Sequence, residues 1–198
     1  MGRMKIAKQG FFMILWMTFV TGIAYPLLIT KGAQLFLNEQ AAGSLFILDK
    51  QVRGSHLIGQ KFEQDKYFWP RPSASDFNPL ASGGSHLGPT SKTLQKQIRE
   101  RQAFLMEKHG LTDPSKIPSG LLFASGSGLD PDLMLSQAVF QLDRVAKARH
   151  MDTEEGKKKI LNLIYTSKVK KSLNLFGREC VNVLLLNHSL DELQQRRD

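Results

Sequence analysis

The sequence predicts an α+β protein with one N-terminal transmembrane helix followed by a single mixed α/β domain outside the cytoplasm. Three observations support this fold class. Residues 11–29 form a long apolar run without a charge, three basic residues and no acidic residue precede it, and helix-like and strand-like segments alternate after it. We therefore expect residues 1–10 to be cytoplasmic, 11–30 to span the membrane, and 31–198 to form the extracytoplasmic domain.

The apolar run is long enough to cross a bilayer. As a helix with a rise of about 1.5 Å per residue, it spans roughly 28 Å, close to the ~30 Å hydrocarbon core. Arg3, Lys5 and Lys8 precede it, and basic residues beside a first apolar segment stay on the cytoplasmic side. The charge pattern thus predicts a single-pass membrane protein with its N-terminus inside.

A cleaved signal peptide is the alternative interpretation of the same segment. Gly22 and Ala24 are small residues at suitable −3 and −1 positions for cleavage. The apolar run continues through Pro26 to residue 29, beyond the usual 7–15 residues of a signal-peptide core. This length favours a retained anchor.

One face of the anchor combines small and polar residues at helical spacing: Thr18, Thr21, Gly22 and Tyr25. Small residues let helices approach closely in lipid, where apolar burial gives no driving force. The stripe is therefore a candidate contact with partner helices, although threonine and glycine are also simply tolerated in such helices.

Composition limits the function classes. The single cysteine, Cys180, excludes an internal disulfide framework and any multi-cysteine metal site. The formal net charge of +9 invites a nucleic-acid interpretation, but an exported, anchored domain does not meet nucleic acid. We expect no nucleic-acid partner and a surface near membrane lipid.

The domain after the anchor shows several elements. Strands are expected at 44–48 and 180–186. A helix capped by Thr90 or Ser91 should run to about His109. Further helices are expected at 133–149, with Asp130 as cap and Pro131 at its first position, from Thr153 onward, and at 189–196, where a short exposed helix closes the chain.

Two loops rich in glycine and serine, 71–91 and 124–131, resemble each other: ASGGSHLGP in the first and ASGSGLDP in the second. Phe77, Leu80 and Leu87 are spaced as if to hold the first loop down on the domain. We interpret the loops as a docking surface, with these candidate residues: Arg71, Ser82, Gly83, Gly84, Ser85, Gly126, Ser127 and Gly128.

No pattern in the chain assembles a catalytic or metal site. Neither loop contains the lysine of a P-loop or the G-x-S-x-G of a nucleophile elbow, and the five histidines lack ligand spacing. We expect no catalytic residue, no metal and no cofactor of the chain's own. A hydrolase using Ser85 or Ser127 beside a base such as His86, and a stand-alone ligand-binding domain, remain alternatives.

The chain resembles the KdpC family, the small subunits of the KdpFABC potassium-transporting P-type ATPases. The N-terminal anchor and several motifs carry the resemblance, in the family's order: GSHLIGQKF at 54–62, YFWPRPSA at 67–74, FNPLASGGSHLGPTS at 77–91, ASGSGLDP at 124–131, QLDRVAKAR at 141–149 and VNVLLLNHSLD at 181–191.

This resemblance implies a non-catalytic subunit that assembles or stabilises a high-affinity potassium pump in the bacterial plasma (inner) membrane. The implied partners are a potassium-channel-like subunit, an ATP-hydrolysing P-type subunit and a small peptide subunit. It also implies that the chain raises the ATP affinity of the P-type subunit, with Gln141 as the ATP contact. ATP is thus implied as a ligand of the complex and not as a cofactor of this chain. The charge rule places Gln141 outside, on the opposite side of the membrane from ATP.

Overall fold

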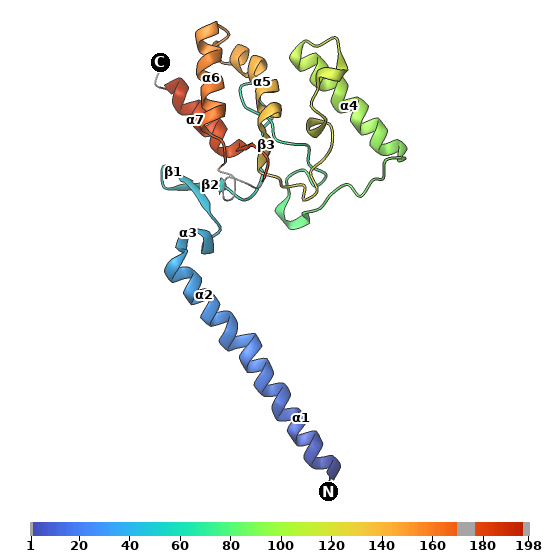
Figure 1. Ribbon diagram of the computed structural model, residues 1–198, viewed down its shortest axis with the longest axis vertical. Helices are drawn as coiled ribbons and strands as arrows, with labels where there is room; N and C mark the ends of the chain where they lie inside the picture. Colours follow the sequence, from blue (N-terminus) through green and yellow to red (C-terminus); the bar gives the residue numbers. More distant parts are fainter. Residues whose placement is uncertain (1, 170–176, 196–198) are drawn as a thin grey trace. The chain divides into compact units, whose positions relative to one another are not determined.

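The computed structural model describes residues 2–169 and 177–195. The chain divides into two compact units, Met1–Arg53 and Gly54–Asp198 (Figure 1). A long N-terminal helix is followed by a mixture of helices and short strands, which confirms the predicted fold class.

The first unit is dominated by one apolar helix of 35 residues, Gly2–Phe36, whose length and composition suit a membrane span. It consists of α1 (Gly2–Phe19), the π-turn η1 (Val20–Ala24) and α2 (Tyr25–Phe36). Pro26 explains the π-turn, because proline has no N–H and its ring collides with the carbonyl four residues back. The wider turn instead bonds the Tyr25 N–H to the Val20 carbonyl.

After the short helix α3 (Asn38–Ala41), β1 (Leu45–Leu48) and β2 (Gln51–Ser55) form a two-stranded sheet, and the first unit ends within β2, at Arg53. The predicted strand at 44–48 is therefore present. Asp49 and Lys50 join the strands with φ angles of 50° and 60°. Positive φ at both central residues is the geometry of the type I′ turn, whose twist matches that of the paired strands.

The described part of the second unit contains four α-helices and a small two-stranded sheet, which α5 and α7 contact. Helix α6 packs against α5 and α7, and α4 packs against α5 (Figure 1). Strands β3 and β4 are antiparallel, with Leu133 opposite Val181. The elements of this unit are η2 (Pro79–Ala81), α4 (Lys92–His109), η3 (Pro114–Lys116), η4 (Ser119–Leu121), β3 (Asp132–Met134), α5 (Leu135–Ala148), α6 (Glu154–Thr166), β4 (Cys180–Asn182) and α7 (Val183–Gln195).

Three helix boundaries were predicted correctly because local capping chemistry fixes them. Ser91 Oγ accepts a hydrogen bond from the Leu94 N–H at the start of α4, and Gly110 ends it in the left-handed conformation at φ 61°. Thr153 Oγ1 accepts from the Gly156 N–H at 3.2 Å and starts α6.

The helix predicted at 133–149 begins later, because β3 occupies the first residues of that range. Asp130 is not its cap. Its Oδ1 accepts the Asp132 N–H at 3.1 Å and so forms a turn ahead of the strand. Pairing with β4, a segment distant in sequence, outweighs the helical pattern of this stretch. Its short sequence gives no sign of that partner.

The strand predicted at 180–186 is also shorter, and only β4 remains of it. Asn182 Oδ1 accepts the Leu185 N–H at 3.2 Å and caps α7, which starts six residues before the predicted 189–196 helix. Leu186 and Leu190 are fully buried, so α7 is a core helix rather than an exposed one. Residue 196 lies outside the described residues.

Candidate functional site

The two glycine- and serine-rich loops, 71–91 and 124–131, lie side by side and are hydrogen-bonded to each other. The Gly83 N–H donates to the Ser127 carbonyl at 2.8 Å, and Ser82 Oγ donates to the same oxygen at 3.0 Å. At the other end of the contact, the Ser125 N–H donates to the Pro72 carbonyl at 2.9 Å. We call this combined surface the paired loops.

Glycine is required where the paired loops approach most closely. Gly128 has φ +69°, and a Cβ added there would lie 2.6 Å from Ser75 Oγ and 2.8 Å from the Gly83 carbonyl oxygen. A Cβ on Gly84 would lie 3.1 Å from the Gly126 oxygen. Gly126 itself has open space where a Cβ would go. The loop sequences thus reflect backbone packing rather than phosphate binding.

The first of the paired loops is shaped by its own short-range contacts. Ser73 Oγ accepts the Phe77 N–H at 2.9 Å, and Asp76 and Phe77 both adopt positive φ angles, 50° and 59°. Such angles are costly for residues with side chains and concentrate at functional loops. Leu80 does not fold down as predicted: 95% of its surface is exposed. The loop therefore presents an apolar side chain to solvent.

An ion pair between Arg71 and Asp130 connects the start of the first loop to the second loop. The Arg71 Nη1 lies 2.8 Å from Asp130 Oδ2, and both side chains are only partly exposed. Such a partly desolvated pair holds better than a pair in open solvent. Gly59 adds another contact, since its N–H donates to the Leu129 carbonyl at 2.8 Å.

The segment leading into the first loop, residues 65–69, is held by side chains at every carbonyl. We call it the strap. Arg144 donates to the carbonyls of Asp65 and Tyr67, and Arg149 Nε donates to that of Lys66 at 2.8 Å. Each of these contacts bridges about 80 residues of sequence, so the strap is positioned by tertiary structure alone.

Two side-chain carboxamides, those of Asn187 and Gln141, hydrogen-bond to the backbone of the remaining strap residues, Phe68 and Trp69. Asn187 of α7 accepts the Phe68 N–H at 2.8 Å and donates to the Phe68 carbonyl at 3.0 Å. Gln141 of α5 does the same to Trp69, at 2.8 and 2.9 Å. The Gln141 oxygen also accepts from Arg144 at 2.7 Å, so both of its lone pairs are used.

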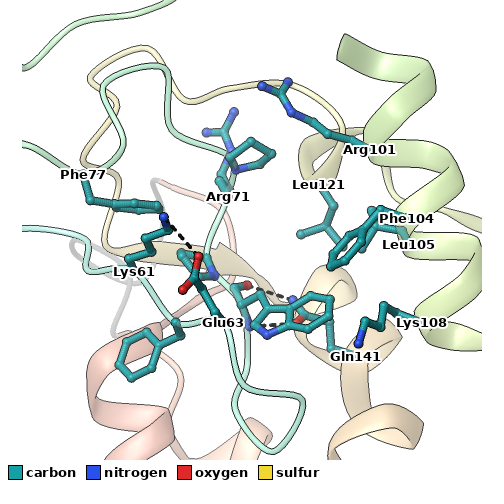
Figure 2. Close-up of a pocket in the computed structure, with 14 residues that line it drawn as sticks. Lys61, Glu63, Arg71, Phe77, Arg101, Phe104, Leu105, Lys108, Leu121 and Gln141 are labelled. Atoms are coloured by element: carbon teal, nitrogen blue, oxygen red, sulfur yellow. Dashed lines mark hydrogen bonds and ion pairs between the residues drawn. The ribbon is translucent and has the colours of Figure 1, made fainter. Parts of the chain in front are cut away.

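A cavity of about 490 Å³ opens between the strap, α4 and the first loop. Figure 2 shows Phe104 and Leu105 projecting from α4 into it, with Arg101 and Lys108 of the same helix on either side. Trp69 and Phe104 stack, with their ring centroids 5.3 Å apart. The cavity is lined by Lys61, Phe62, Glu63, Trp69, Pro70, Arg71, Pro72, Phe77, Arg101, Phe104, Leu105, Lys108, Leu121 and Gln141.

One buried cation, Arg144, lies against the indole of Trp69. The Arg144 guanidinium carbon lies 3.6 Å from the Trp69 ring centroid, a cation–π contact. Burial lowers the pKa of Arg144 to about 10. His109, whose ring faces Phe140 at 4.4 Å, has its pKa lowered to about 4 by burial and by the Arg144 charge. The Trp69 ring, which lines the cavity, therefore contacts a buried cation and a histidine whose charged form is disfavoured.

Comparison with known proteins places this geometry in a family. The family model described as KdpC, K+-transporting ATPase c chain, matches residues 7–192. The chain belongs to the KdpC family. Three relatives, each called potassium-transporting ATPase KdpC subunit, are similar over most of both chains: 42% identical in Leptospira interrogans (90% of each chain), 44% in Serratia proteamaculans (96% of this chain, 100% of the relative) and 43% in Pectobacterium atrosepticum (96% and 97%).

The predicted docking residues of this KdpC-family chain come together in the structure. Seven of them, the residues at 82–85 and 126–128, lie on the paired loops, and Arg71 lies at their base. The contacts between the loops, which link positions some 45 residues apart, could be suspected only from the repeated Ala-Ser-Gly pattern.

The four stripe residues lie on the apolar helix of the first unit. Thr21 Oγ1 donates to the Met17 carbonyl at 2.7 Å, which satisfies the hydroxyl within the helix. A Cβ on Gly22 would meet only Thr18 Cγ2, at 4.0 Å. The π-turn contains Thr21 and Gly22. Because Gly22 has no side chain, it leaves open space on the helix surface before Tyr25, which we call the notch.

The structure assigns Gln141 a positioning contact with Trp69. It is 1% exposed and its oxygen has no lone pair left for a ligand. The ATP contact at Gln141 stays a prediction from the family resemblance. In the part of the chain that the structure describes, no histidine is hydrogen-bonded to Ser85 or Ser127, and Ser127 Oγ instead accepts the Leu129 N–H at 3.1 Å.

Sequence reasoning missed the cavity and the clamps on the strap. Arg144 and Arg149 were not singled out, because a polar residue on an amphipathic helix looks like a solvated position, and Asn187, which follows the predicted strand at 180–186, was not expected in a helix. The available signal was their placement: Arg144 on α5 and Asn187 on α7 lie among buried aliphatic residues, and Arg149 is the C-cap of α5. A polar side chain in such a row needs a buried partner.

Proposed function

We propose that this chain is a non-catalytic subunit of an ATP-driven potassium pump, and that it assembles or stabilises the complex. The observation that supports this most is the KdpC family match across residues 7–192. Three structural features are also typical of a protein that binds partners: the apolar helix with its notch at Gly22, the exposed Leu80 and the paired loops. The proposed partners are a channel-like subunit, a P-type ATPase subunit and a small peptide subunit.

Co-purification tests this function directly. The full chain, tagged and extracted in mild detergent together with its membrane, should retain a large polytopic subunit and an ATPase, identified by mass spectrometry. Potassium-stimulated ATP hydrolysis should co-elute. Purification of the chain by itself, from cells that express the other subunits, would refute the proposal.

The proposed membrane topology has the N-terminus inside and the main domain outside. Arg3, Lys5 and Lys8 support it through the charge rule. Reporter fusions at the C-terminus, active only on one side of the membrane, provide the test. A cytoplasmic C-terminus would overturn the topology and place the paired loops beside the ATP-hydrolysing machinery.

The finer role, raising the ATP affinity of the P-type subunit, is also part of this proposal. With the domain outside, the effect would be a coupling between separate sites, carried through the anchor or the partner, rather than a direct contact. The ATP dependence of hydrolysis by the complex, measured with and without this chain, tests it. An unchanged KM for ATP would remove this role and leave the assembly role intact.

A stand-alone ligand-binding domain is the second candidate, because the cavity of about 490 Å³ falls in the size range of small-molecule sites. It predicts that the full chain in detergent, free of partners, binds a small molecule at that cavity. Native mass spectrometry of the purified chain separates the two candidates.

A further inference from the structure

The cavity beside the strap has the composition of a protein-binding hot spot. Its walls combine Trp69, Phe104 and Phe77 with arginine at the rim. Aromatic residues and arginine are the types that dominate binding energy at protein interfaces. Phe104 leaves 48% of its surface exposed although it stacks on Trp69. A ring so placed can cover an inserted apolar side chain at little further cost.

The positive charges at the rim are not equally matched by carboxylates. Lys61 pairs with Glu63 at 3.0 Å, Arg71 with Asp130 at 2.8 Å, and Lys108 with Asp65 at 3.2 Å; Lys61 also meets Asp76. Three of the four rim cations are thus neutralised within the domain.

Arg101 is the fourth cation and has no carboxylate within ion-pair distance among residues 2–169 and 177–195. Its Nη1 donates to the Leu122 carbonyl at 2.8 Å. Burial lowers the pKa of Arg101, and the acid that opposes this, Glu100, pairs with Lys96. A partly buried guanidinium without a counter-charge is costly unless an anion joins it.

The cavity is continuous with the paired loops. Arg71, Pro72 and Phe77 line it and also belong to the loop 71–91, so a partner bound to that loop would lie beside the cavity. This continuity favours a protein segment over a free small molecule, because the same partner would be held at both places.

We propose that the cavity receives a segment of a partner subunit that presents an apolar side chain next to a carboxylate, with the apolar group between Phe104 and Phe77 and the carboxylate on Arg101. This inference rests on the proposed function, since it needs a partner subunit. It adds which part of the domain binds that partner and by which chemistry.

Photo-crosslinking in the assembled complex tests the occupant. A photoreactive phenylalanine analogue replaces Phe104 in one full-length chain and Leu80 in a second, and each complex is irradiated in mild detergent. The position-104 chain should crosslink to a partner peptide that contains an aspartate or glutamate beside an apolar residue. Crosslinks at 104 to lipid, to a small molecule or to nothing would overturn the inference.

Matched variants measure the contribution of the charge. Arg101→Gln keeps a donor for the Leu122 carbonyl and removes the charge, and we expect it to lower the position-104 crosslink yield about tenfold. Arg99→Gln makes the same change at an exposed position of the same helix and should leave the yield unchanged. Phe104→Ala, tested by partner retention at increasing salt, should dissociate earlier than wild type.

The outcomes also separate this inference from the proposed function. If wild type retains no partner, the proposed function fails. If wild type retains its partners and position 80 crosslinks to them, but Arg101→Gln and Arg99→Gln behave alike, only the inference about the cavity fails. Circular dichroism of each variant complex confirms that the domain is folded.

Discussion

Gln141 pairs its side-chain carboxamide with the backbone of Trp69 as one strand pairs with another, accepting at 2.8 Å and donating at 2.9 Å. Asn187 makes the same pairing with Phe68, the residue before Trp69. Neighbouring residues of an extended chain point their backbone polar groups in opposite directions. Two side chains on α5 and α7 therefore replace the strands that would flank the strap in a sheet.

Loss of either carboxamide should destabilise the domain strongly. Gln141→Leu leaves the buried N–H and carbonyl of Trp69 without partners, and Asn187→Leu does so for Phe68. We expect each to cost about 2–4 kcal/mol, since a buried group left unpaired loses its hydration without compensation. Urea unfolding of the full chain in detergent, followed by near-UV circular dichroism, measures this. Gln95→Leu, at an exposed position of α4, should stay within about 0.5 kcal/mol of wild type.

The same pair of variants separates a structural from a nucleotide-binding role of Gln141. If Gln141 acts through the strap, both leucine variants should lower stability and pump activity in parallel. If Gln141→Leu instead keeps wild-type stability and changes only the ATP dependence, the structural interpretation is wrong and a direct contact with ATP is supported.

The helix boundaries set by Ser91, Gly110 and Thr153 could be predicted from sequence because they depend on residues at most a few positions away. The strap could not, because its partners are distant: Gln141 lies 72 residues from Trp69 and Asn187 lies 119 residues from Phe68. The cavity was missed for the same reason, since its walls come from the strap, α4 and the loop 71–91. The two loops were chosen as a docking surface because they are rich in glycine and serine, and that role stays a prediction.

Acid should weaken the second unit through His109. Its pKa is lowered from 6.5 to about 4 in the folded chain, because the ring is buried between aromatic side chains near Arg144. Well above pH 6.5 the imidazole is neutral in both the folded and the unfolded chain, and this contribution to the free energy of unfolding is fully present. As the pH falls from 6.5 to 4, only the unfolded chain takes up the proton, so stability falls by less than about 1.4 kcal/mol per pH unit. Below about pH 4 this loss levels off.

Urea unfolding at pH 7 and pH 5 measures the effect of His109. His109→Phe keeps a ring in the aromatic cluster without a titrating group, so the drop between the two pH values should shrink. His86→Gln, which alters a histidine on the exposed face of the loop 71–91, should leave the drop as in wild type. An equal drop in the His109→Phe variant would assign the acid sensitivity to other groups.

Glycines of the paired loops should respond very differently to alanine. Gly128→Ala combines an unfavourable positive φ with a Cβ 2.6 Å from Ser75 Oγ, so it should separate the loops and cost at least about 1 kcal/mol. Gly126→Ala, two residues earlier, has open space and should be nearly neutral. Limited proteolysis of the loops and heat unfolding report the difference. Equal resistance of the two variants would show that the loop contact contributes little to the domain.

The notch at Gly22 allows a test of the anchor that does not disturb its own helix. A Cβ there meets only Thr18 Cγ2, at 4.0 Å, so Gly22→Leu should span the membrane normally. If the stripe packs on a partner helix, the added side chain prevents close approach and the partners should be lost on extraction in mild detergent. Gly10→Leu, where a Cβ also meets nothing within 4 Å, is the matched control and should retain them. Retention of all partners by both variants, with unchanged pump activity, would leave the stripe facing lipid, and assembly would then depend on the paired loops and the cavity alone.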